Sequence, residues 1–317
     1  MNKRPLGSTG FEIAPLVFGG NVFGWTADER TSFALLDRFV DAGFNAIDTA
    51  DAYSAFAPGN KGGESETIIG KWLKQSPERR EKVVIITKVG SAFGPHKKGL
   101  SAQRIATAVE ESLQRLQTDR IDVYLSHFPD PGTPIEETLN AYDKLLKAGK
   151  VRAIGGSNYS AEQLREALSA SAQKGLPRYE VLQPEYNLYD RGSYEGELRD
   201  LCVREKIGVI TYFSLASGFL SGKYRAKDDI QKKPRAQLLE KYFNDRGFRI
   251  LEALDSVAKS QTAKPAEVAL GWLMQRQGVT APIASATSLE QLESLIRSAQ
   301  LQLSADEKDQ LDRASAP

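Results

Sequence analysis

Short apolar runs alternate with longer amphipathic stretches along almost the whole chain, and this alternation restricts the fold more than any other feature. Strands of a sheet joined by crossover helices produce this pattern, and such strands run parallel to one another. We expect eight strands, at residues 16–19, 45–48, 83–87, 121–125, 151–155, 181–183, 208–212 and 282–284.

The stretches between these runs have helical spacing. In residues 101–116, Ile105, Val109, Leu113 and Leu116 recur three or four positions apart, which places them on one face of a helix. Ser101 can cap the free amides of the first turn. By the same reasoning we expect further helices at residues 31–42, 134–148, 161–172 and 265–277.

Eight such units in about 300 residues, with no break in composition, favour a closed (β/α)8 TIM barrel over a doubly wound sheet. Residues 4–6 and 12–16 flank a Gly-Ser-Thr-Gly turn, which predicts a β-hairpin that closes the bottom of the barrel. Residues 223–247 are charged and irregular, and we expect a loop over the rim. The prediction is one domain over residues 1–317, with extra helices at its C-terminal end.

Composition excludes several classes of function. The 42 Lys and Arg residues balance 41 Asp and Glu residues, so no basic surplus favours nucleic acid or an anionic membrane as partner. We find neither the apolar stretch of a signal peptide nor a membrane span and expect a cytoplasmic protein. Cys202 is the only cysteine, which excludes an intrachain disulfide and a cysteine metal cluster. Its apolar neighbours predict a core position.

Four polar residues, Asp48, Tyr53, Lys88 and His127, lie at or just past the ends of the second, third and fourth expected strands. Active sites of such barrels form at this rim. A nearby ammonium lowers the pKa of a phenol, so Lys88 would make Tyr53 a better proton donor. Asp48 would supply the counter-charge that a buried lysine needs, and His127 would orient or protonate a substrate oxygen.

Each of the four residues also has a structural explanation. Asp48 could cap the following turn, Tyr53 could pack at the rim, and Lys88 could be only the ion-pair partner of Asp48. His127 could be a loop histidine bonded to the backbone. Their joint position at the ends of successive strands is what favours a proton-donating site.

Three longer motifs occur in a fixed order along the chain. Residues 45–53 contain an Asp-x4-Tyr block, residues 63–66 read Gly-Glu-Ser-Glu, and residues 149–158 read Gly-Lys-Val-Arg-Ala-Ile-Gly-Gly-Ser-Asn. Through nearly its entire length the sequence resembles the aldo-keto reductase superfamily. The resemblance implies that Tyr53 is the general acid, assisted by Lys88 and Asp48, while His127 positions the carbonyl. It also implies hydride delivery from C4 of NADPH.

The resemblance further implies a nicotinamide nucleotide site that lacks a Rossmann fingerprint, and no G-x-G-x-x-G follows any expected strand. Tyr212 would stack on the nicotinamide ring, and its carboxamide would be held by Ser157, Asn158 and Gln183. Backbone from 213 to 218 would clamp the pyrophosphate with Ser217 and Lys223, although Gln183 and Ser217 could instead satisfy neighbouring backbone. The remaining cofactor residues implied are Gly20, Asn21, Val22, Asp48, Phe213, Ser214, Leu215, Gly218, Ser285, Thr287 and Gln291.

The adenine end of the site departs from the family pattern. Ser294 and Leu295 stand where the family has a Glu-Asn pair, and the basic residues that often hold the 2′-phosphate are missing there. Arg235 in the charged rim segment would replace them, since a guanidinium suits phosphate geometry, or would simply be solvated. NADPH is the favoured cofactor, with NADH as the alternative.

Two alternatives to a carbonyl reductase remain. One is a nucleotide-sensing regulatory subunit, which His127 disfavours because the channel subunits of the family usually have Asn there. The other is a barrel enzyme that uses Lys88 as a Schiff base, which the adjacent carboxylate disfavours because it keeps the amine charged. Five rim aromatics, which could equally be packing residues, suit apolar or aromatic aldehydes and ketones; they are Phe23, Trp25, Phe56, Phe93 and Phe128.

Overall fold

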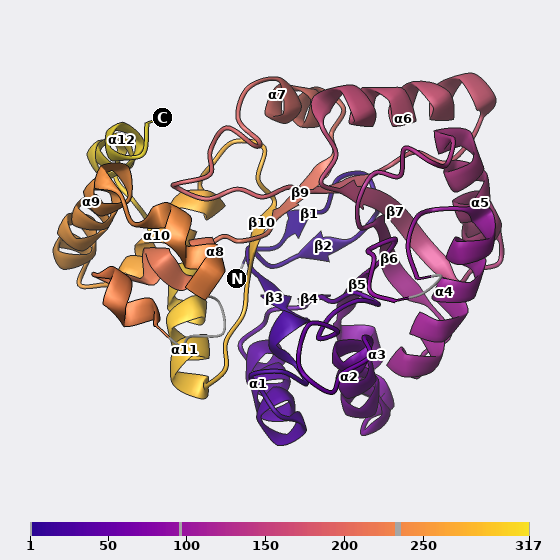
Figure 1. The fold of residues 1–317 in the computed structure, drawn as a ribbon, viewed down its shortest axis with the longest axis horizontal. Helices are drawn as coiled ribbons and strands as arrows, with labels where there is room; N and C mark the ends of the chain where they lie inside the picture. Colours follow the sequence, from indigo (N-terminus) through magenta and orange to yellow (C-terminus); the bar gives the residue numbers. More distant parts are fainter. Residues whose placement is uncertain (1, 95–96, 232–235, 317) are drawn as a thin grey trace.

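The computed structural model describes residues 2–94, 97–231 and 236–316 (Figure 1). Within them, eight parallel strands close a barrel in the order β10-β3-β4-β5-β6-β7-β8-β9, which confirms the predicted TIM barrel. The strands are β3 (Val17–Gly19), β4 (Ala46–Asp48), β5 (Val84–Val89), β6 (Ile121–Ser126), β7 (Val151–Ser157), β8 (Val181–Gln183), β9 (Gly208–Thr211) and β10 (Ala281–Ala284).

A short hairpin closes the bottom of the barrel, as predicted. Strands β1 (Arg4–Pro5) and β2 (Glu12–Ile13) pair antiparallel, and the fully buried Leu6 joins the apolar cluster that fills the barrel interior. Gly7, with φ of 59°, lies so close to the barrel that a Cβ there would come 2.4 Å from the carbonyl oxygen of Glu180. Only glycine therefore fits this contact.

Helices surround the barrel (Figure 1), and all five predicted helices are present with ends shifted by up to three residues. Ser101 caps its helix by accepting from the Arg104 amide at 3.3 Å, and Cys202 is buried as predicted. The helices are α1 (Glu29–Asp41), α2 (Glu64–Lys74), α3 (Pro77–Lys82), α4 (Ala102–Leu116), α5 (Ile135–Lys147), α6 (Ala161–Lys174), α7 (Glu197–Arg204), α8 (Ala236–Leu239), α9 (Asp245–Gln261), α10 (Pro265–Met274), α11 (Leu289–Ser298) and α12 (Ala305–Ala314). Among the described residues, no helix is both long and apolar enough to cross a lipid bilayer.

The rim segment at residues 223–247 is more ordered than the predicted loop. It contains two 3-10 turns, Lys227–Ile230 and Glu240–Tyr242, together with α8 and the start of α9. Ile230, Leu239 and Tyr242 are buried and give this charged segment an apolar anchor. The prediction of an irregular loop was therefore wrong for its described part.

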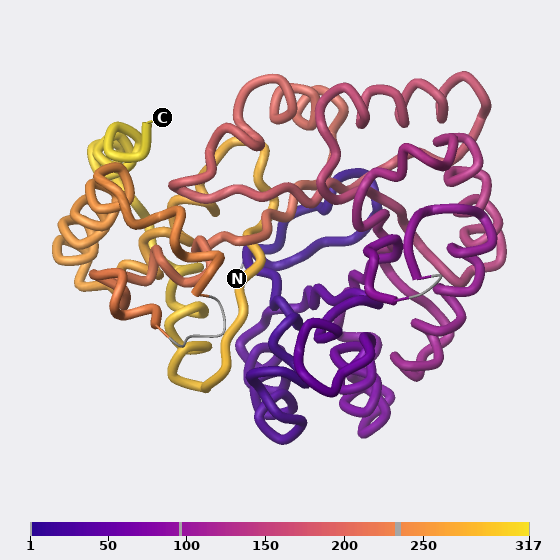
Figure 2. The backbone as a smooth tube through the Cα atoms, viewed as in Figure 1, coloured from indigo at the N-terminus to yellow at the C-terminus, as the bar shows by residue number. Residues whose placement is uncertain are grey.

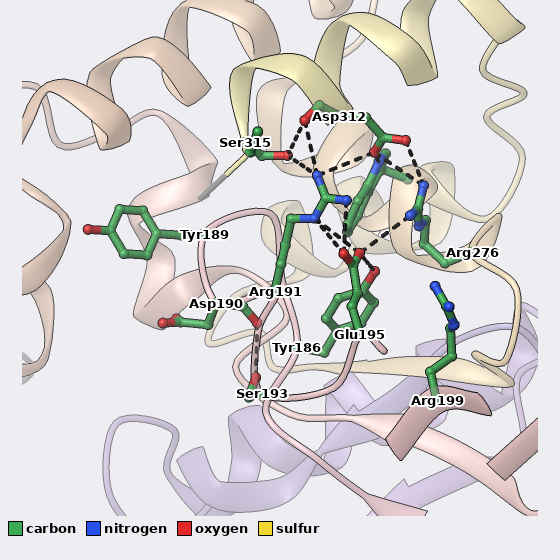
Figure 3. Close-up of polar contacts among 12 residues, drawn as sticks. Tyr186, Tyr189, Asp190, Arg191, Ser193, Glu195, Arg199, Arg276, Asp312 and Ser315 are labelled. Carbon is green, nitrogen blue, oxygen red and sulfur yellow. Dashed lines mark hydrogen bonds and ion pairs between the residues drawn. The ribbon is translucent and has the colours of Figure 1, made fainter. Parts of the chain in front are cut away.

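The C-terminal helix packs against α9, and Figure 2 shows the yellow chain end beside the orange segment that contains α9. In Figure 3, Asp312 of α12 accepts from Arg276 Nη1 at 2.8 Å. Asp312 also accepts from Trp272 Nε1 at 2.8 Å. Its carbonyl oxygen accepts from Arg191 Nη1 at 3.0 Å, and Arg191 in turn pairs with Glu195 at 2.9 Å. These contacts join the C-terminal helix to the segment that follows β8.

Candidate active site

The parallel register of the barrel brings the four polar residues to one rim. Asp48 ends β4, Lys88 lies near the end of β5, and His127 directly follows β6. Tyr53 lies in the turn after β4. Side chains alternate between the two faces of a strand, so Asp48 and Lys88 point into the barrel like their neighbours Ala46 and Ile86.

Asp48, Lys88 and Tyr53 form a closed triangle of hydrogen bonds. Lys88 Nζ donates to Asp48 Oδ2 at 2.8 Å and to the Tyr53 hydroxyl oxygen at 2.7 Å. The Tyr53 hydroxyl donates to Asp48 Oδ2 at 3.0 Å. A third acceptor, the carbonyl oxygen of Thr49, lies 2.8 Å from Lys88 Nζ. Lys88 and Asp48 are buried, so a charged pair is fixed directly beneath the phenol.

Burial shifts the pKa of the Tyr53 phenol in the direction opposite to the predicted one. The pKa of Tyr53 is raised well above its ordinary value, first by burial and then by the Asp48 carboxylate. Burial also lowers the pKa of Lys88, against the opposing effect of Asp48. The prediction of a lowered pKa for Tyr53 is wrong for this state, because burial and then the Asp48 carboxylate raise that pKa. Tyr53 therefore holds its proton at neutral pH.

His127 is held by its backbone rather than by its ring. Its amide donates to the Val89 carbonyl at 2.8 Å, and its own carbonyl accepts from Asn158 Nδ2 at 2.9 Å. The ring lies 6.0 Å from the Tyr53 ring and stacks on Phe128 at 5.0 Å. Burial, with a smaller effect of Lys88, lowers the pKa of His127 to about 3. A neutral imidazole can orient an oxygen by hydrogen bonding but supplies no proton at neutral pH.

A polar network connects this site to the ends of β7, β8 and β9. Gln183 Nε2 donates to Asp48 Oδ1 at 2.7 Å, and Ser157 Oγ donates to the Gln183 carbonyl at 2.8 Å. Asn158 Nδ2 donates to Ser157 Oγ at 3.1 Å, while the Tyr212 hydroxyl donates to Asn158 Oδ1 at 2.6 Å. The structure thus brings Ser157, Asn158, Gln183 and Tyr212 together next to Asp48.

The segment after β9 has a strained backbone. Phe213, Ala216 and Ser217 are non-glycine residues with φ of 51°, 49° and 57°, and Gly218 has φ of 99°. Strained positions of this kind gather at ligand-binding sites, and successive amides in such turns form concave anion sites. Ser217 Oγ is buried and has no hydrogen-bond partner among the described residues. This orphaned hydroxyl and the exposed Lys223 fit a pyrophosphate group at this turn.

Sequence reasoning missed Asn187, whose side chain bonds to the backbone of that turn. Asn187 is fully buried, and its Nδ2 donates to the Phe213 carbonyl at 3.0 Å. Its Oδ1 accepts from the amides of Tyr189 and Asp190. An asparagine shortly after a strand was the available signal, but the partner lies 26 positions later.

The remaining predicted cofactor residues fall into two groups at the barrel rim. Gly20, Asn21 and Val22 form a 3-10 turn after β3, and Ser285 Oγ donates to Asn21 Oδ1 at 2.7 Å. Gln291 Oε1 accepts from the Thr287 amide at 2.9 Å.

In the segment after β9, Ser214 is buried with its hydroxyl bonded to the Thr211 carbonyl, and Leu215 is half-buried. Arg235 lies outside the described residues.

Four of the five predicted pocket aromatics are at least partly exposed. Trp25 and Phe56 meet edge to face at 4.8 Å, Phe128 is exposed, and Phe93 is half-buried. Phe23 corrects the prediction, since it is fully buried in the core and stacks on Phe18 at 5.3 Å. Its ring therefore offers no surface to a substrate.

Comparison with known proteins finds similar sequences over nearly the whole length of the chain. The family model described as Aldo/keto reductase family matches residues 15–316. The aldo-keto reductase YhdN of Bacillus subtilis (strain 168) is 33% identical over 93% of this chain and 88% of its own length. A probable voltage-gated potassium channel subunit beta of Oryza sativa subsp. japonica is 35% identical over 92% of this chain and 89% of its own.

Proposed function

Because this chain belongs to the aldo/keto reductase family of oxidoreductases, we propose that it reduces aldehydes or ketones to alcohols by hydride transfer from NADPH. The observation that carries the proposal is the Tyr53 hydroxyl, which lies within 3.0 Å of both Asp48 Oδ2 and Lys88 Nζ. A protonated phenol with a buried cation beside it is suited to donate a proton to an oxygen that gains negative charge.

In the proposed reaction, each of the four residues has one task. Tyr53 donates its hydroxyl proton to the carbonyl oxygen, and the phenolate that remains is stabilised by Lys88 Nζ at 2.7 Å. Asp48 and the Thr49 carbonyl hold that ammonium in place. Neutral His127 donates a hydrogen bond that orients the carbonyl. When bound, the reduced nicotinamide supplies the hydride.

The network at the ends of β7 to β9 is the proposed nicotinamide site. Ser157, Asn158 and Gln183 would bind the carboxamide, and Tyr212 would stack on the ring. The strained turn at 213–218, with Lys223, would bind the pyrophosphate, because its amides and the orphaned Ser217 hydroxyl offer donors to an anion. The adenine side would lie along Gly20, Asn21, Val22, Ser285, Thr287 and Gln291.

We also propose that residues 1–317 act as one domain. The N-terminal hairpin leads into Leu6 of the barrel interior, and α12 bonds through Asp312 to Arg191 in the segment after β8. The preference for NADPH over NADH rests on Arg235, which lies outside the described residues. A nucleotide-binding regulatory subunit is the second candidate, because one of the similar proteins is a probable channel subunit. His127 beside Tyr53 favours turnover.

The test is a panel of aliphatic and aromatic aldehydes and ketones, each incubated with the purified protein and NADPH or NADH. We expect consumption of NADPH only when a carbonyl compound is present, with an equimolar yield of alcohol. Tight nucleotide binding without consumption across the whole panel would contradict the proposal and support the regulatory candidate.

A further inference from the structure

Four charged residues lie directly behind Lys88, outside the barrel wall, and the proposed mechanism assigns them no role. We name Asp51, Glu66, Arg104 and Arg115 the outer charge cluster. Asp51 and Glu66 are fully buried, and Arg104 is buried as well. Burying charged groups costs free energy unless each is paired. A cluster this close to a proposed proton donor therefore needs an explanation.

Strand β5 links the cluster to the proposed catalytic lysine. Side chains alternate along the strand, so Thr87 faces outward where Lys88 faces into the barrel. Thr87 Oγ1 donates to Glu66 Oε1 at 2.6 Å, and Arg115 Nε donates to Glu66 Oε2 at 2.7 Å. Glu66 is thus fully bonded and fixed one residue from Lys88.

Asp51 is the member of the cluster whose charge is least compensated. It lies in the turn between Asp48 and Tyr53, and its amide donates to the Lys88 carbonyl at 3.2 Å. Oδ2 of Asp51 accepts from Arg104 Nη2 at 2.6 Å. Oδ1 is buried without a hydrogen-bond partner among the described residues, and so is Arg104 Nε. The pair therefore leaves one polar atom unsatisfied on each side.

The titratable groups that interact with Asp51 or pair with Arg104 come from five elements. They are Glu66 of α2, Arg104, Glu111 and Arg115 of α4, Lys88 of β5, Tyr124 of β6 and Tyr142 of α5. With both carboxylates ionised, the two negative and two positive charges of the outer charge cluster cancel. Burial and the Glu66 charge raise the pKa of Asp51 to about 7, against the effect of Arg104 and Arg115. Protonated Asp51 leaves the cluster with a net charge of +1.

We propose that Asp51 is a positioning residue that acts through Lys88, so that its charge state sets how readily Tyr53 releases its proton. The inference rests on the proposed function. Proton donation by Tyr53 leaves a phenolate, and a more positive surrounding stabilises that anion. Neutral Asp51 therefore favours reduction of the carbonyl, whereas ionised Asp51 favours the reverse reaction. The carboxyl group contacts neither substrate nor nucleotide in this scheme.

The test compares kcat/KM for carbonyl reduction in the wild type and Asp51→Asn from about pH 5 to about pH 9. Asparagine is neutral at every pH, so the ratio of variant to wild type should be near one at the acid end. It should rise through the titration of Asp51 to a value on the order of ten-fold, the effect of one charge at about 10 Å in protein. A ratio that stays constant with pH would overturn the proposal.

Asp122→Asn is the matched control. Asp122 is a buried carboxylate on β6 that binds Arg80 at 2.9 Å and the Ile85 amide. It resembles Asp51 in burial and pairing, but it lies at the opposite end of the barrel from Tyr53. We expect this variant to lose stability and to keep the wild-type pH profile. The same pH-dependent ratio in Asp122→Asn would also overturn the proposal.

A second measurement covers the case in which Asp51→Asn does not fold. Carbon-13 NMR of the wild type, with its aspartate carboxyl groups labelled, should show Asp51 titrating near neutral pH. Titration of all aspartates near pH 4 would overturn the proposal. This readout needs no turnover, so a protein that reduces no carbonyl compound would contradict the proposed function while the titration still tests Asp51.

Discussion

Lys88 Nζ lies 2.7 Å from the hydroxyl oxygen of Tyr53, and the two groups share one oxygen of the Asp48 carboxylate. Burial and, after it, this shared carboxylate raise the pKa of the phenol despite the adjacent ammonium. Asp48 neutralises the lysine and, with burial, keeps the proton on Tyr53. The arrangement holds a protonated acid next to a cation that can stabilise its conjugate base, which suits donation to a developing alkoxide.

Tyr53→Phe should remove the proton donor and leave its surroundings in place. We expect kcat to fall by about 10²- to 10⁴-fold, the usual contribution of a general acid. Lys88 and Asp48 still pair in this variant, so NADPH affinity should change by only a few-fold. Steady-state kinetics and fluorescence titration measure the two quantities separately. Loss of NADPH binding would contradict the role given to Tyr53.

Tyr124→Phe is the matched control for that substitution. Tyr124 is fully buried on β6, and its hydroxyl has no hydrogen-bond partner among the described residues. Removing an unsatisfied buried hydroxyl is neutral or stabilising. This variant should keep the wild-type kcat and unfold at an equal or higher temperature.

Asn187→Ala tests whether the strained turn after β9 binds the nucleotide. The substitution removes the hydrogen bond to the Phe213 carbonyl, so the turn loses a contact that holds φ of Phe213 at 51°. We expect the Kd for NADPH to rise about five- to thirty-fold, which corresponds to about 1–2 kcal/mol for one buried hydrogen bond. Asn140→Ala, on the outer face of α5, is the control and should bind normally. If both variants bind NADPH with equal affinity, the turn after β9 is not part of the nucleotide site.

The sequence predicted the features that depend on local pattern. The alternation of apolar runs indicated the barrel because strand and helix periods are visible within single elements. Asp48, Lys88 and His127 could be selected because parallel strands carry their last residues to the same rim. The direction of the pKa shift at Tyr53 could not, since it depends on how deeply the finished fold buries the phenol.

Features that depend on distant contacts were missed. Asp51 and Arg104 are 53 positions apart, and nothing in either segment indicates that they pair. Phe23 looked like a pocket wall because it follows a strand, but it packs inward on Phe18. The short helices at residues 227–230 and 236–242 include the buried Ile230, Leu239 and Tyr242, and tertiary packing of this kind overrides a charged, irregular sequence.

Asp312→Ala should weaken the attachment of the C-terminal helix without affecting chemistry. The variant loses the bonds from Trp272 Nε1 and Arg276 Nη1 shown in part in Figure 3. We expect the free energy of unfolding to fall by about 1–3 kcal/mol, with kcat unchanged because Tyr53 is remote. Asp309→Ala is the control, since Asp309 pairs with Arg313 on the exposed face of the same helix. Urea denaturation should place it within about 0.5 kcal/mol of the wild type.

The pH dependence of stability should contain two opposite contributions from the active-site region. The pKa of His127 falls from 6.5 to about 3 on folding, so its contribution is complete above about pH 6.5 and is lost as the pH falls. The pKa of Asp51 rises from 3.8 to about 7 on folding, so its contribution is complete below about pH 4 and is lost as the pH rises. Between about pH 4 and about pH 6.5, the pH dependences of the two contributions have opposite signs and nearly cancel in the wild type.

Single substitutions should reveal each contribution. Relative to the wild type, the unfolding free energy of Asp51→Asn should rise with pH by about 1.4 kcal/mol per unit between about pH 4 and pH 6.5. That of His127→Asn should fall with pH at a similar rate over the same window, because only the Asp51 contribution remains. Urea denaturation at closely spaced pH values measures both slopes. Parallel profiles for the three proteins would show that neither His127 nor Asp51 changes its proton affinity on folding. Asp51 would then stay ionised between about pH 4 and pH 6.5, and its charge behind Lys88 would not change with pH.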